Sequence, residues 1–516
     1  MSLDLKRTRS IETWTLVSTI LASSMAFIDG SALNVVLSNL QHELGASGAQ
    51  LLWIVNAYLL MLAALILTGG ALGDRFGRNR IFGMGIILFA TASLACGLSP
   101  TIEFLLTMRV IQGIGGALMV PGSLAIITAT FSRQRRGWAI GIWSAASTLT
   151  TMSGPAIGGV LASLGLWRFV FFINVPLAIF AIFALTRVPE TRDEDATGRF
   201  DLAGTLLVVL GLFGITYGAI GMGNRSGTEP VNPLDVLALI VGLVSLVGFI
   251  VVEMRVAHPM MPLAIFRSRA FAGTNAMCVF LYGALSGALF FFPLNLIQIQ
   301  GYNPALAGLA SLPFSILLAA LSPIMGRMTD HFGARLLLTV GPAVVAAGFV
   351  LLAVPGLTAG PISYWWTYFP AILCIGAGMG ITVAPLTTTV MSSVASHQSG
   401  LASGVNNAVT RSAQVLALAI LGAVAIFSFS SALQVRTAPL PLSAQQRSTL
   451  ASDAGKLGAT PPPPGLDQHT TSQVETAVQE SFISMFRLLA VIGSAMALLS
   501  AALAWLVVKP PAATAA

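Results

Sequence analysis

The sequence predicts an all-α polytopic membrane protein, and three observations support this fold class. Of its 516 residues, 55% are hydrophobic and only 9% are charged. A soluble domain has about 25% charged residues, so this composition cannot cover a surface that faces water. Apolar runs of about 20 residues follow one another along the chain, and each is long enough to cross a bilayer as a helix. A charged motif between two such runs recurs once, in the second half of the chain.

Fourteen apolar runs, separated by polar or Gly/Pro-rich joints, are the predicted membrane spans. An even number of spans places both ends of the chain on one side, and basic residues indicate which side. With cytoplasmic ends, the inner segments hold 18 of the 26 Lys and Arg residues and the outer segments hold six. The sequence therefore predicts that both termini are cytoplasmic. The predicted spans are 13–36, 50–72, 79–98, 103–130, 137–164, 168–187, 202–222, 234–254, 271–294, 305–326, 335–355, 364–391, 400–430 and 483–508.

The charged motif indicates how the spans are grouped. GALGDRFGRNRI at 70–81 recurs in degenerate form as GRMTDHFGARL at 326–336, after the second and the tenth span. Two halves of six spans with two inserted spans fit this spacing, and parallel repeats of this kind are common in secondary transporters. We expect an N-terminal six-helix bundle over 1–200, two inserted helices over 201–255 and a C-terminal six-helix bundle over 256–516.

The longest connection is predicted outside the membrane. Residues 431–482 are rich in Pro, Ser and Gln. Such composition favours a solvated, partly irregular tether. A short helix near 471–479 is compatible with the sequence.

The chain lacks the motifs of several other function classes. It contains no catalytic triad pattern, phosphate-binding loop or metal-ligand spacing, so we expect no enzymatic activity and no cofactor beyond a coupling proton. Cys96, Cys278 and Cys374 lie within apolar runs and are interpreted as small hydrophobic residues. The net charge of +7 is distributed in short clusters between spans, which does not favour nucleic-acid binding.

Asp29 is the only acidic residue well inside a predicted span. A carboxylate in hydrocarbon costs about 2.5–3.5 kcal/mol, so it must face a cavity, carry a proton or have a partner. Arg109 in the fourth span lies at a similar depth, since each residue is about six or seven positions from the outer end of its span. If these spans pack together, the two residues form a proton-responsive pair. The alternative is a structural polar residue that its neighbours satisfy.

The motif at 70–81 is predicted to act as a conformational latch at the cytoplasmic face. Its glycines permit a sharp turn, and its aspartate can accept hydrogen bonds from the N-terminus of a neighbouring helix. A merely topogenic charge cluster would need neither the glycines nor the aspartate. The residues assigned to the latch are Gly70, Gly73, Asp74, Arg75, Gly77, Arg78 and, in the second copy, Asp330.

The fifth span contains SGPAIGG at 153–159. Pro155 removes a backbone hydrogen bond and is expected to kink this helix. Gly154, Gly158 and Gly159 form a small-residue face that suits close helix packing.

Polar and aromatic residues within the spans are candidates for a cavity between the two halves. Each of them also suits ordinary hydrogen bonding between helices. Arg411 has no carboxylate at its depth, and a structural and a functional role are equally open. The cavity candidates are Asn34, Trp53, Asn56, Tyr58, Gln112, Trp143, Asn275, Tyr282, Asn406, Asn407, Arg411 and Gln414.

Six segments, in order along the chain, resemble motifs of the major facilitator superfamily. The segment 70–81 is similar to the signature between its second and third spans. LTMRVIQGIGG at 106–116 is similar to its fourth-span motif, and SGPAIGG is similar to the fifth-span motif typical of antiporters. IDGSALNVVL at 28–37, WRFVFFINVP at 167–176 and HPMMPLAIFRSRAF at 258–271 resemble motifs of its fourteen-span drug:proton antiporter branch.

The resemblance implies a proton-coupled antiporter in a bacterial cell membrane, with Arg109 implicated in proton transfer. Two departures concern the cargo: Gly30 and Ser31 follow Asp29 where Thr is more usual, and spans nine to fourteen contain no acidic residue. With one membrane acid, the expected cargo is lipophilic and neutral or monocationic, as in multidrug efflux by alternating access. Dedicated export of one endogenous metabolite, antibiotic or lipid is an alternative, and a non-transporting sensor or facilitator is a second. We expect a monomer in the lipid bilayer.

Overall fold

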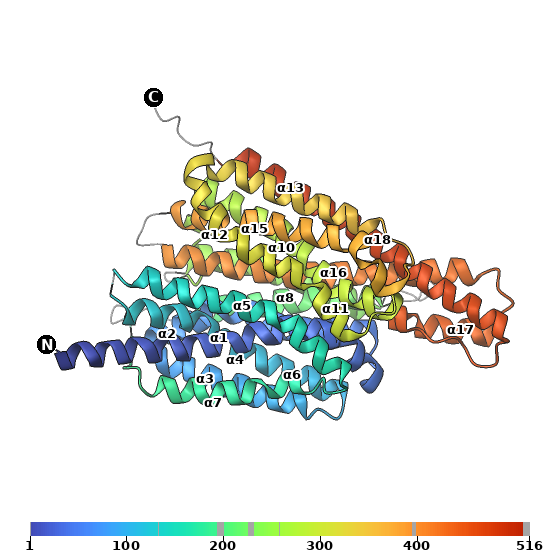
Figure 1. The fold of residues 1–516 in the computed structure, drawn as a ribbon, viewed down its shortest axis with the longest axis horizontal. Helices are drawn as coiled ribbons and strands as arrows, with labels where there is room; N and C mark the ends of the chain where they lie inside the picture. The colour runs from blue at the N-terminus through green and yellow to red at the C-terminus, as the bar shows by residue number, and fades with distance from the viewer. Residues whose placement is uncertain are drawn as a thin grey trace.

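The computed structural model describes residues 2–132, 134–192, 201–224, 232–256, 259–394 and 399–508. In this part of the chain, regular secondary structure is helical, and the long helices run in one general direction (Figure 1). Helices suit apolar segments because each one pairs its own backbone N–H and C=O groups. We call the end of the bundle where α1 begins and α18 ends the termini end, and the opposite end, which carries α17, the cap end.

The N-terminal group of helices packs around α4. Helices α2 and α3 both lie against α4, while α1 packs against α4, α5 and α7. The packing of α1 on α4 was a requirement of the predicted Asp29–Arg109 pair. The group consists of α1 (Ser2–Leu44), α2 (Gly48–Phe76), α3 (Arg78–Gly97), α4 (Ile102–Thr130), α5 (Arg136–Ser163), α6 (Phe169–Phe172) and α7 (Asn174–Leu185).

The C-terminal group is arranged around α10, α15 and α18. Helix α13 packs against α15 and α18, and α10 packs against α16 and α18. A π-helical turn at Asn295–Ile299 ends α10. The group consists of α10 (Arg269–Leu294), α11 (Pro304–Ala310), α12 (Leu312–Phe332), α13 (Ala334–Ala353), α14 (Tyr364–Thr367), α15 (Phe369–Ser392), α16 (Ser399–Thr437), α17 (Ala444–Asp453) and α18 (Gln468–Val507).

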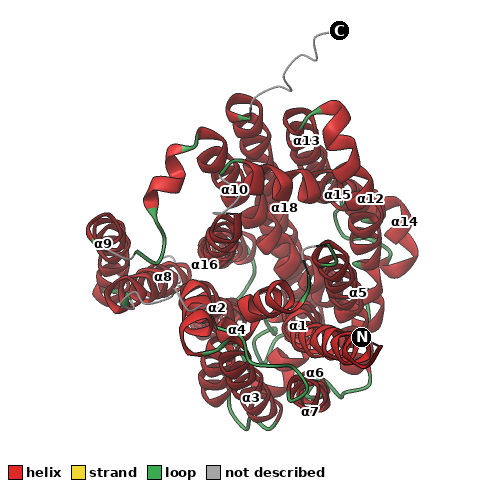
Figure 2. Cartoon of the chain, turned by 90° about the vertical axis from the view of Figure 1, so that its left-hand side faces the viewer, coloured by secondary structure: helices red, strands yellow, loops and turns green. Residues whose placement is uncertain are grey.

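Helices α8 (Leu202–Gly223) and α9 (Pro233–Arg255) form a pair on the flank of the bundle. Figure 2 shows this pair beside α2 and α16, and α8 contacts both of these helices. Through α8, the pair therefore contacts both α2 of the N-terminal group and α16 of the C-terminal group. Its position corresponds to the two inserted spans that the sequence predicts.

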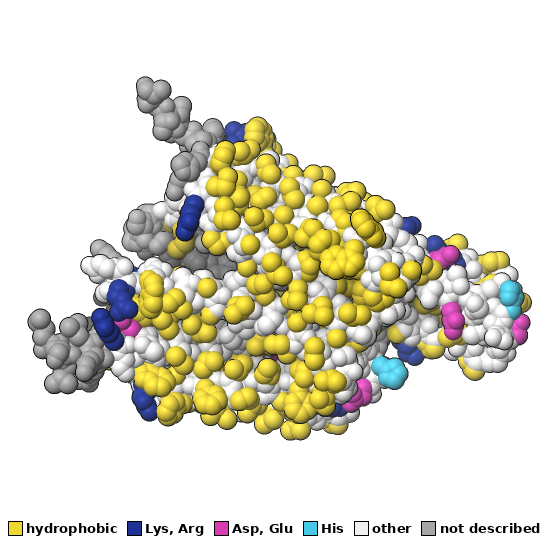
Figure 3. Space-filling view, in the orientation of Figure 1, with side chains coloured by type: hydrophobic (Ala, Val, Ile, Leu, Met, Phe, Trp, Pro, Cys, Tyr) yellow, Lys and Arg dark blue, Asp and Glu magenta, His cyan; other side chains and the backbone are white. Residues whose placement is uncertain are grey.

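Twelve helices of the described residues are long and apolar enough to cross a membrane. The predicted spans 137–164 and 168–187 correspond to α5 and to α6 with α7. These helices are not among the twelve that are both long and apolar enough. Helix α5 carries several Ser and Thr residues, and the apolar stretch Phe169–Leu185 is short. Hydrophobic side chains cover the side of the molecule in Figure 3, with Lys and Arg gathered toward the two ends. Of the basic residues used to predict orientation, Arg133, Arg199, Arg225 and Lys509 lie outside the described residues.

The two copies of the charged motif adopt the same turn. Gly77 separates α2 from α3 with φ of 108°, and Gly333 separates α12 from α13 with φ of 75°. Such positive φ values favour glycine because it lacks a Cβ. In both turns the glycine N–H donates to the carbonyl four residues earlier, at 3.1 Å for Gly77 and 2.9 Å for Gly333.

Residues 431–482 contain more helix than the predicted, partly irregular tether. Helix α16 continues to Thr437, α17 and a 3₁₀ helix at Ala454–Ala459 follow, and α18 begins at Gln468. The short helix expected near 471–479 is part of α18. We call residues 438–467, between α16 and α18, the cap segment. Its sequence looked like a linker because of its prolines, among them the run at 461–464, whereas a few local contacts order it.

Arg447 organises the start of the cap segment. Its guanidinium donates to the carbonyls of Thr437, Ala438 and Leu440, at 2.8–3.2 Å. Ser443 and Gln446 form a reciprocal capping box at the start of α17. Such a box satisfies backbone donors that a helix N-terminus leaves free.

The cap segment also bridges the two groups of helices. Gln41 on α1 donates through Nε2 to the Lys456 carbonyl at 2.9 Å, and its Oε1 accepts from Gln298 Nε2 at 2.7 Å. Leu457, only 2% exposed, packs against Gly48 at the start of α2. The cap end of the bundle is therefore closed by contacts between α1, the cap segment and the end of α10.

Candidate functional site

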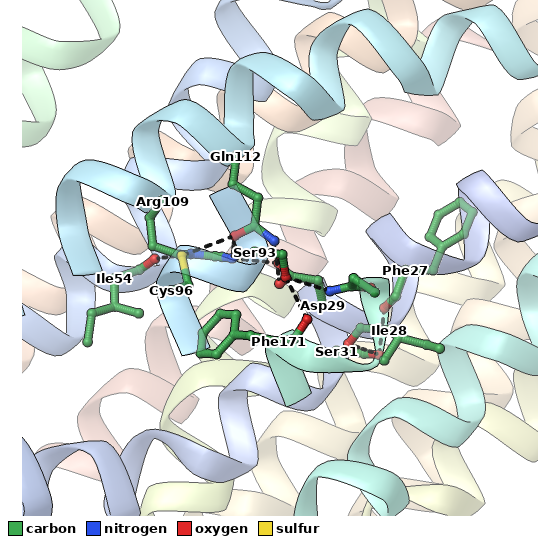
Figure 4. A network of polar contacts seen from close by, with 11 residues as sticks. Phe27, Ile28, Asp29, Ser31, Ile54, Ser93, Cys96, Arg109, Gln112 and Phe171 are labelled. Carbon is green, nitrogen blue, oxygen red and sulfur yellow. Dashed lines mark hydrogen bonds and ion pairs between the residues drawn. The ribbon is translucent and has the colours of Figure 1, made fainter. Parts of the chain in front are cut away.

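Asp29 and Arg109 form an ion pair in the interior of the N-terminal group. Arg109 Nη1 on α4 lies 2.6 Å from Asp29 Oδ2 on α1, and the side chains are 1% and 0% exposed. Figure 4 shows the two side chains pointing at each other between their helices. The matched depth of the two residues therefore predicts their contact correctly.

Three further residues complete the network. Gln112 Nε2 donates to Asp29 Oδ1 at 2.9 Å, and Gln112 Oε1 accepts from Arg109 Nη1 at 2.7 Å. Arg109 Nε donates to the Ile54 carbonyl at 3.0 Å, as Figure 4 shows. The Arg109 guanidinium also lies 4.5 Å from the centre of the Tyr58 ring. Gln112 and Tyr58 were predicted as cavity residues, but they are 0% and 2% exposed and belong to this buried network.

This arrangement can respond to a proton. Both Asp29 oxygens accept hydrogen bonds, and the carboxylate balances the charge of Arg109. A proton on Asp29 would remove that balance and leave Arg109 buried without a counter-charge. Loss of one partner of a buried pair costs about 3–5 kcal/mol, so protonation can drive a rearrangement of α1 against α4.

The latch motif contains one short ion pair. Arg78 donates through Nε to Asp74 Oδ1 at 2.8 Å, one helical turn away across Gly77. Gly70 and Gly73 belong to α2, and Arg75 lies 5.3 Å from the ring of Phe76. The side chain of Asp330 in the second copy lies outside the described part of the structure.

Glu190, which the sequence reasoning missed, caps the helix that follows the latch turn. Its carboxylate accepts from the backbone N–H groups of Asn79 and Arg80, at 2.9 and 3.0 Å. At the start of α3 this role, which the sequence suggested for Asp74, belongs to Glu190, while Asp74 pairs with Arg78. A carboxylate at a helix N-terminus is favourable because of the helix dipole. Glu190 lies 111 positions beyond Asn79, and no local pattern connects the two.

Asp74→Ala is expected to slow turnover severalfold while cargo affinity stays within about twofold of wild type. The Asp74–Arg78 pair is partly exposed and lies at the turn between α2 and α3, so we expect it to influence the change of state rather than binding. Rates of efflux and equilibrium binding, measured on the same purified protein, check this. Glu480→Ala removes another exposed acid, paired with Arg436, and serves as the control. An equal loss of affinity and rate would contradict a latch.

The SGPAIGG motif lies where the two groups of helices meet. Gly154 and Gly158 face α1: a Cβ at Gly158 would lie 2.6 Å from the Ala32 carbonyl oxygen. Gly159 lies against the Pro304 carbonyl at the start of α11, and Gly308 lies against the Pro155 carbonyl. Pro155 lies inside α5, as expected. The small residues thus allow α5 to approach one helix from each group.

Gly159→Val is expected to reduce efflux by about tenfold or more because a side chain at this position collides with the backbone of α11. Overpacking of a close contact costs about 1–3 kcal/mol, and here the cost falls on the state in which α5 and α11 touch. Gly141→Val on the same helix is the control, because a Cβ there meets no atom within 4 Å. Equal efflux by the two variants would show that the α5–α11 contact has no role in the cycle.

Two predicted cavity residues contact neighbouring helices. The Trp53 ring lies 5.8 Å from Phe213 and 6.3 Å from Tyr217 on α8, so Trp53 packs against the inserted pair. Trp143 on α5 donates through Nε1 to Ser23 on α1 at 3.0 Å.

The remaining candidates divide by exposure. Asn406 Nδ2 on α16 donates to Asn275 Oδ1 on α10 at 3.1 Å, which joins two helices of the C-terminal group. Asn56 is 0% exposed, and its side-chain nitrogen and oxygen have no hydrogen-bond partner among the described residues. The candidates with partly or fully exposed side chains are Asn34, Tyr282, Asn407, Arg411 and Gln414.

Comparison with known proteins places this geometry in a family. The sequence profile of the Major Facilitator Superfamily matches residues 19–437. The multidrug resistance protein Stp of Mycobacterium tuberculosis is 32% identical over 442 residues, which cover 85% of this chain and 80% of Stp. The tetracenomycin C resistance and export protein of Streptomyces glaucescens is 31% identical over 497 residues, which cover 95% of this chain and 90% of that protein.

A solved structure shows the same fold. It is a bacterial homologue of the human lysosomal transporter Spinster, in an inward-facing and unoccupied conformation. Its TM-score is 0.66 at 18% identity, and the match covers 97% of this chain and 99% of that one. The protein is a multi-pass membrane protein, and it belongs to the Major Facilitator Superfamily of transporters.

Proposed function

We propose that this protein is a proton-coupled exporter of lipophilic small molecules that works by alternating access. The observation that carries the proposal is the buried Asp29–Arg109 pair, with its charges 2.6 Å apart between α1 and α4. An ion pair at this position is expensive to bury, and membrane carboxylates commonly mark proton pathways. The resistance and export proteins among its relatives support the direction of transport.

In the proposed cycle, Asp29 takes up a proton in the outward-facing state and its hold on Arg109 weakens. The two groups of helices then rock about the cargo site. In the inward-facing state the proton leaves, the ion pair forms again and cargo enters. The closed cap end and the intact pair correspond to the inward-facing, deprotonated stage of this cycle.

The proposed topology has fourteen spans in a bacterial cell membrane, with both termini in the cytoplasm. Helix α5 and the α6–α7 stretch would supply the two spans beyond the twelve strongly apolar ones. The cap segment would then lie outside the cell, and the latch turn would face the cytoplasm. We propose a monomer, because each chain carries its own pair and both groups of helices.

The names of the relatives bear on the breadth of the cargo. One relative is named as a multidrug resistance protein and another for a single antibiotic. Multidrug efflux is proposed here, and dedicated export of one compound is the alternative. A panel of unrelated drugs, tested in a susceptible host that expresses the protein, separates the two.

Proton release from the purified protein tests the coupling. Addition of cargo in a weakly buffered solution should release protons, because cargo favours the state in which Asp29 is charged. Protein treated with the same concentration of a compound that it does not export is the control. Binding of cargo without any proton release would contradict proton coupling.

A further inference from the structure

Arg411 is a charged residue that is not part of the proposed proton-coupling site. It lies ten residues beyond Leu401, where the apolar part of α16 begins, and therefore about 15 Å along the helix. A charge at such depth costs about 2.5–3.5 kcal/mol unless it has a partner. Among the described residues, no hydrogen bond or ion pair engages its guanidinium.

The neighbours of Arg411 on α16 show which way this side chain faces. Gly404 lies against the Leu67 side chain of α2, and Val415 packs with Leu60 of the same helix. Positions 404, 411 and 415 share one helix face because they are seven and four residues apart. Arg411 therefore lies on the face of α16 that is turned toward α2. Helix α16 of the C-terminal group packs against α2 of the N-terminal group, as Figure 2 shows.

Three polar residues along α16 are not fully buried. Asn407, one turn closer to the termini end, is exposed, and Arg411 and Gln414 are partly exposed. By contrast Asn406, on the next face, is bonded to Asn275 on α10. The side chains of Asn407, Arg411 and Gln414 thus form a polar stripe apart from the Asn406 side chain, while the Gln414 backbone carbonyl accepts from Ser286 on α10 at 3.2 Å.

Tyr58 on α2, the helix that Arg411 faces, belongs to the proton-coupling network. Its ring lies 4.5 Å from the guanidinium of Arg109. Asp29 balances the charge of Arg109. Within the described part of the chain, the positive charge of Arg411 therefore has no paired carboxylate.

We propose that Arg411 binds an acidic group of the cargo, and that the preferred cargo is a lipophilic organic anion with a carboxylate or sulfonate. The proposal rests on the transport function proposed above and adds a substrate class to it. A guanidinium presents a planar fork of donors that matches such a group with two hydrogen bonds. A cationic cargo would meet the same charge as repulsion. The preference differs from the neutral or monocationic cargo expected from the count of acids alone.

The proposal also predicts how the membrane potential affects transport. If one proton enters in each cycle, export of a neutral cargo moves one charge across the membrane, and export of a monoanion moves two. An inside-negative potential should therefore accelerate export of the anion more steeply than export of the neutral compound.

A matched pair of fluorescent probes tests the proposal in proteoliposomes with a fixed pH gradient. The anion is 8-anilinonaphthalene-1-sulfonate, and the neutral parent is N-phenyl-1-naphthylamine. Wild type should transport the anion faster. Arg411→Gln should reduce transport of the anion by about tenfold or more, which is the effect of one charged hydrogen bond, and should change the neutral probe by less than about twofold. Arg411→Lys should restore part of the anion transport.

Two comparisons make the outcomes distinct. Arg436→Gln removes a basic residue at the outer part of the same helix and should leave both probes unaffected. Equal loss of both probes in Arg411→Gln would overturn the proposal in favour of a structural role, and so would no loss of either. Failure of wild type to transport the anion would also overturn it. A different result would contradict proton coupling, namely that Asp29→Asn still transports the neutral probe against its gradient.

Discussion

Asp29→Asn is expected to reduce efflux driven by a pH gradient to the level of protein-free vesicles. The substitution keeps the shape of the side chain and its hydrogen bond to Gln112, but it cannot exchange a proton. Because Arg109 then has no buried counter-charge, we also expect a loss of stability of about 3–5 kcal/mol. Efflux in proteoliposomes with an imposed gradient measures the first effect, and thermal unfolding of the purified variant measures the second.

An exchange assay separates coupling from misfolding. At equal pH on both sides, Asp29→Asn should still exchange labelled for unlabelled cargo, because cargo movement itself does not need the carboxylate. Asp29→Glu should retain part of the gradient-driven efflux. Glu480→Gln, which changes an exposed acid 53% accessible to solvent, should behave as wild type. Unchanged gradient-driven efflux by Asp29→Asn would end the proposed role of this residue.

A cross-link between positions 41 and 298 is expected to stop transport completely. Gln41 on α1 and Gln298 at the end of α10 touch at 2.7 Å, and they belong to different groups of helices. Alternating access requires this contact to open, since the cap end closes the proposed path to the outside. Gln41→Cys with Gln298→Cys, joined by a short bismethanethiosulfonate reagent, should therefore hold the protein in one state. Reduction of the link should restore efflux.

The controls for this experiment lie at the same end of the bundle. Each single cysteine variant, treated with the same reagent, should keep its efflux, which also accounts for the three natural cysteines. A link between Arg436→Cys and Glu480→Cys joins α16 to α18 within one group, so it should be tolerated. Full transport by the linked 41–298 protein would show that the cap end does not open during the cycle.

The ion pair shows how far sequence reasoning can reach into a site. Asp29 and Arg109 are conspicuous because charge is costly in hydrocarbon, and residues at equal depth on neighbouring helices must lie close if they are to neutralise each other. The sequence does not specify which helices are neighbours or which polar groups turn toward the pair. Gln112 and Tyr58 therefore looked like cavity residues, although both are buried in the network.

Contacts between segments distant in the sequence are a second kind of feature that the sequence did not predict. Glu190 caps the start of α3 from the segment after α7, and nothing in the local sequence distinguishes it from any other exposed acid. Arg447 orders the cap segment through backbone carbonyls, which have the same chemistry in every residue. A pattern of side chains carries no signal for such contacts, because one partner is the backbone.

The sequence by itself determined the helical membrane fold, the recurring glycine turn and the charged pair. These features follow from local or one-dimensional properties: the length of apolar runs, the recurrence of a glycine turn and the cost of charge in lipid. Only the tertiary structure decided that the cap segment is folded, that Glu190 rather than Asp74 caps α3, and that Arg411 faces α2. Each of these depends on which surfaces meet when the helices pack, and packing is set by many weak contacts that no single segment of the sequence specifies.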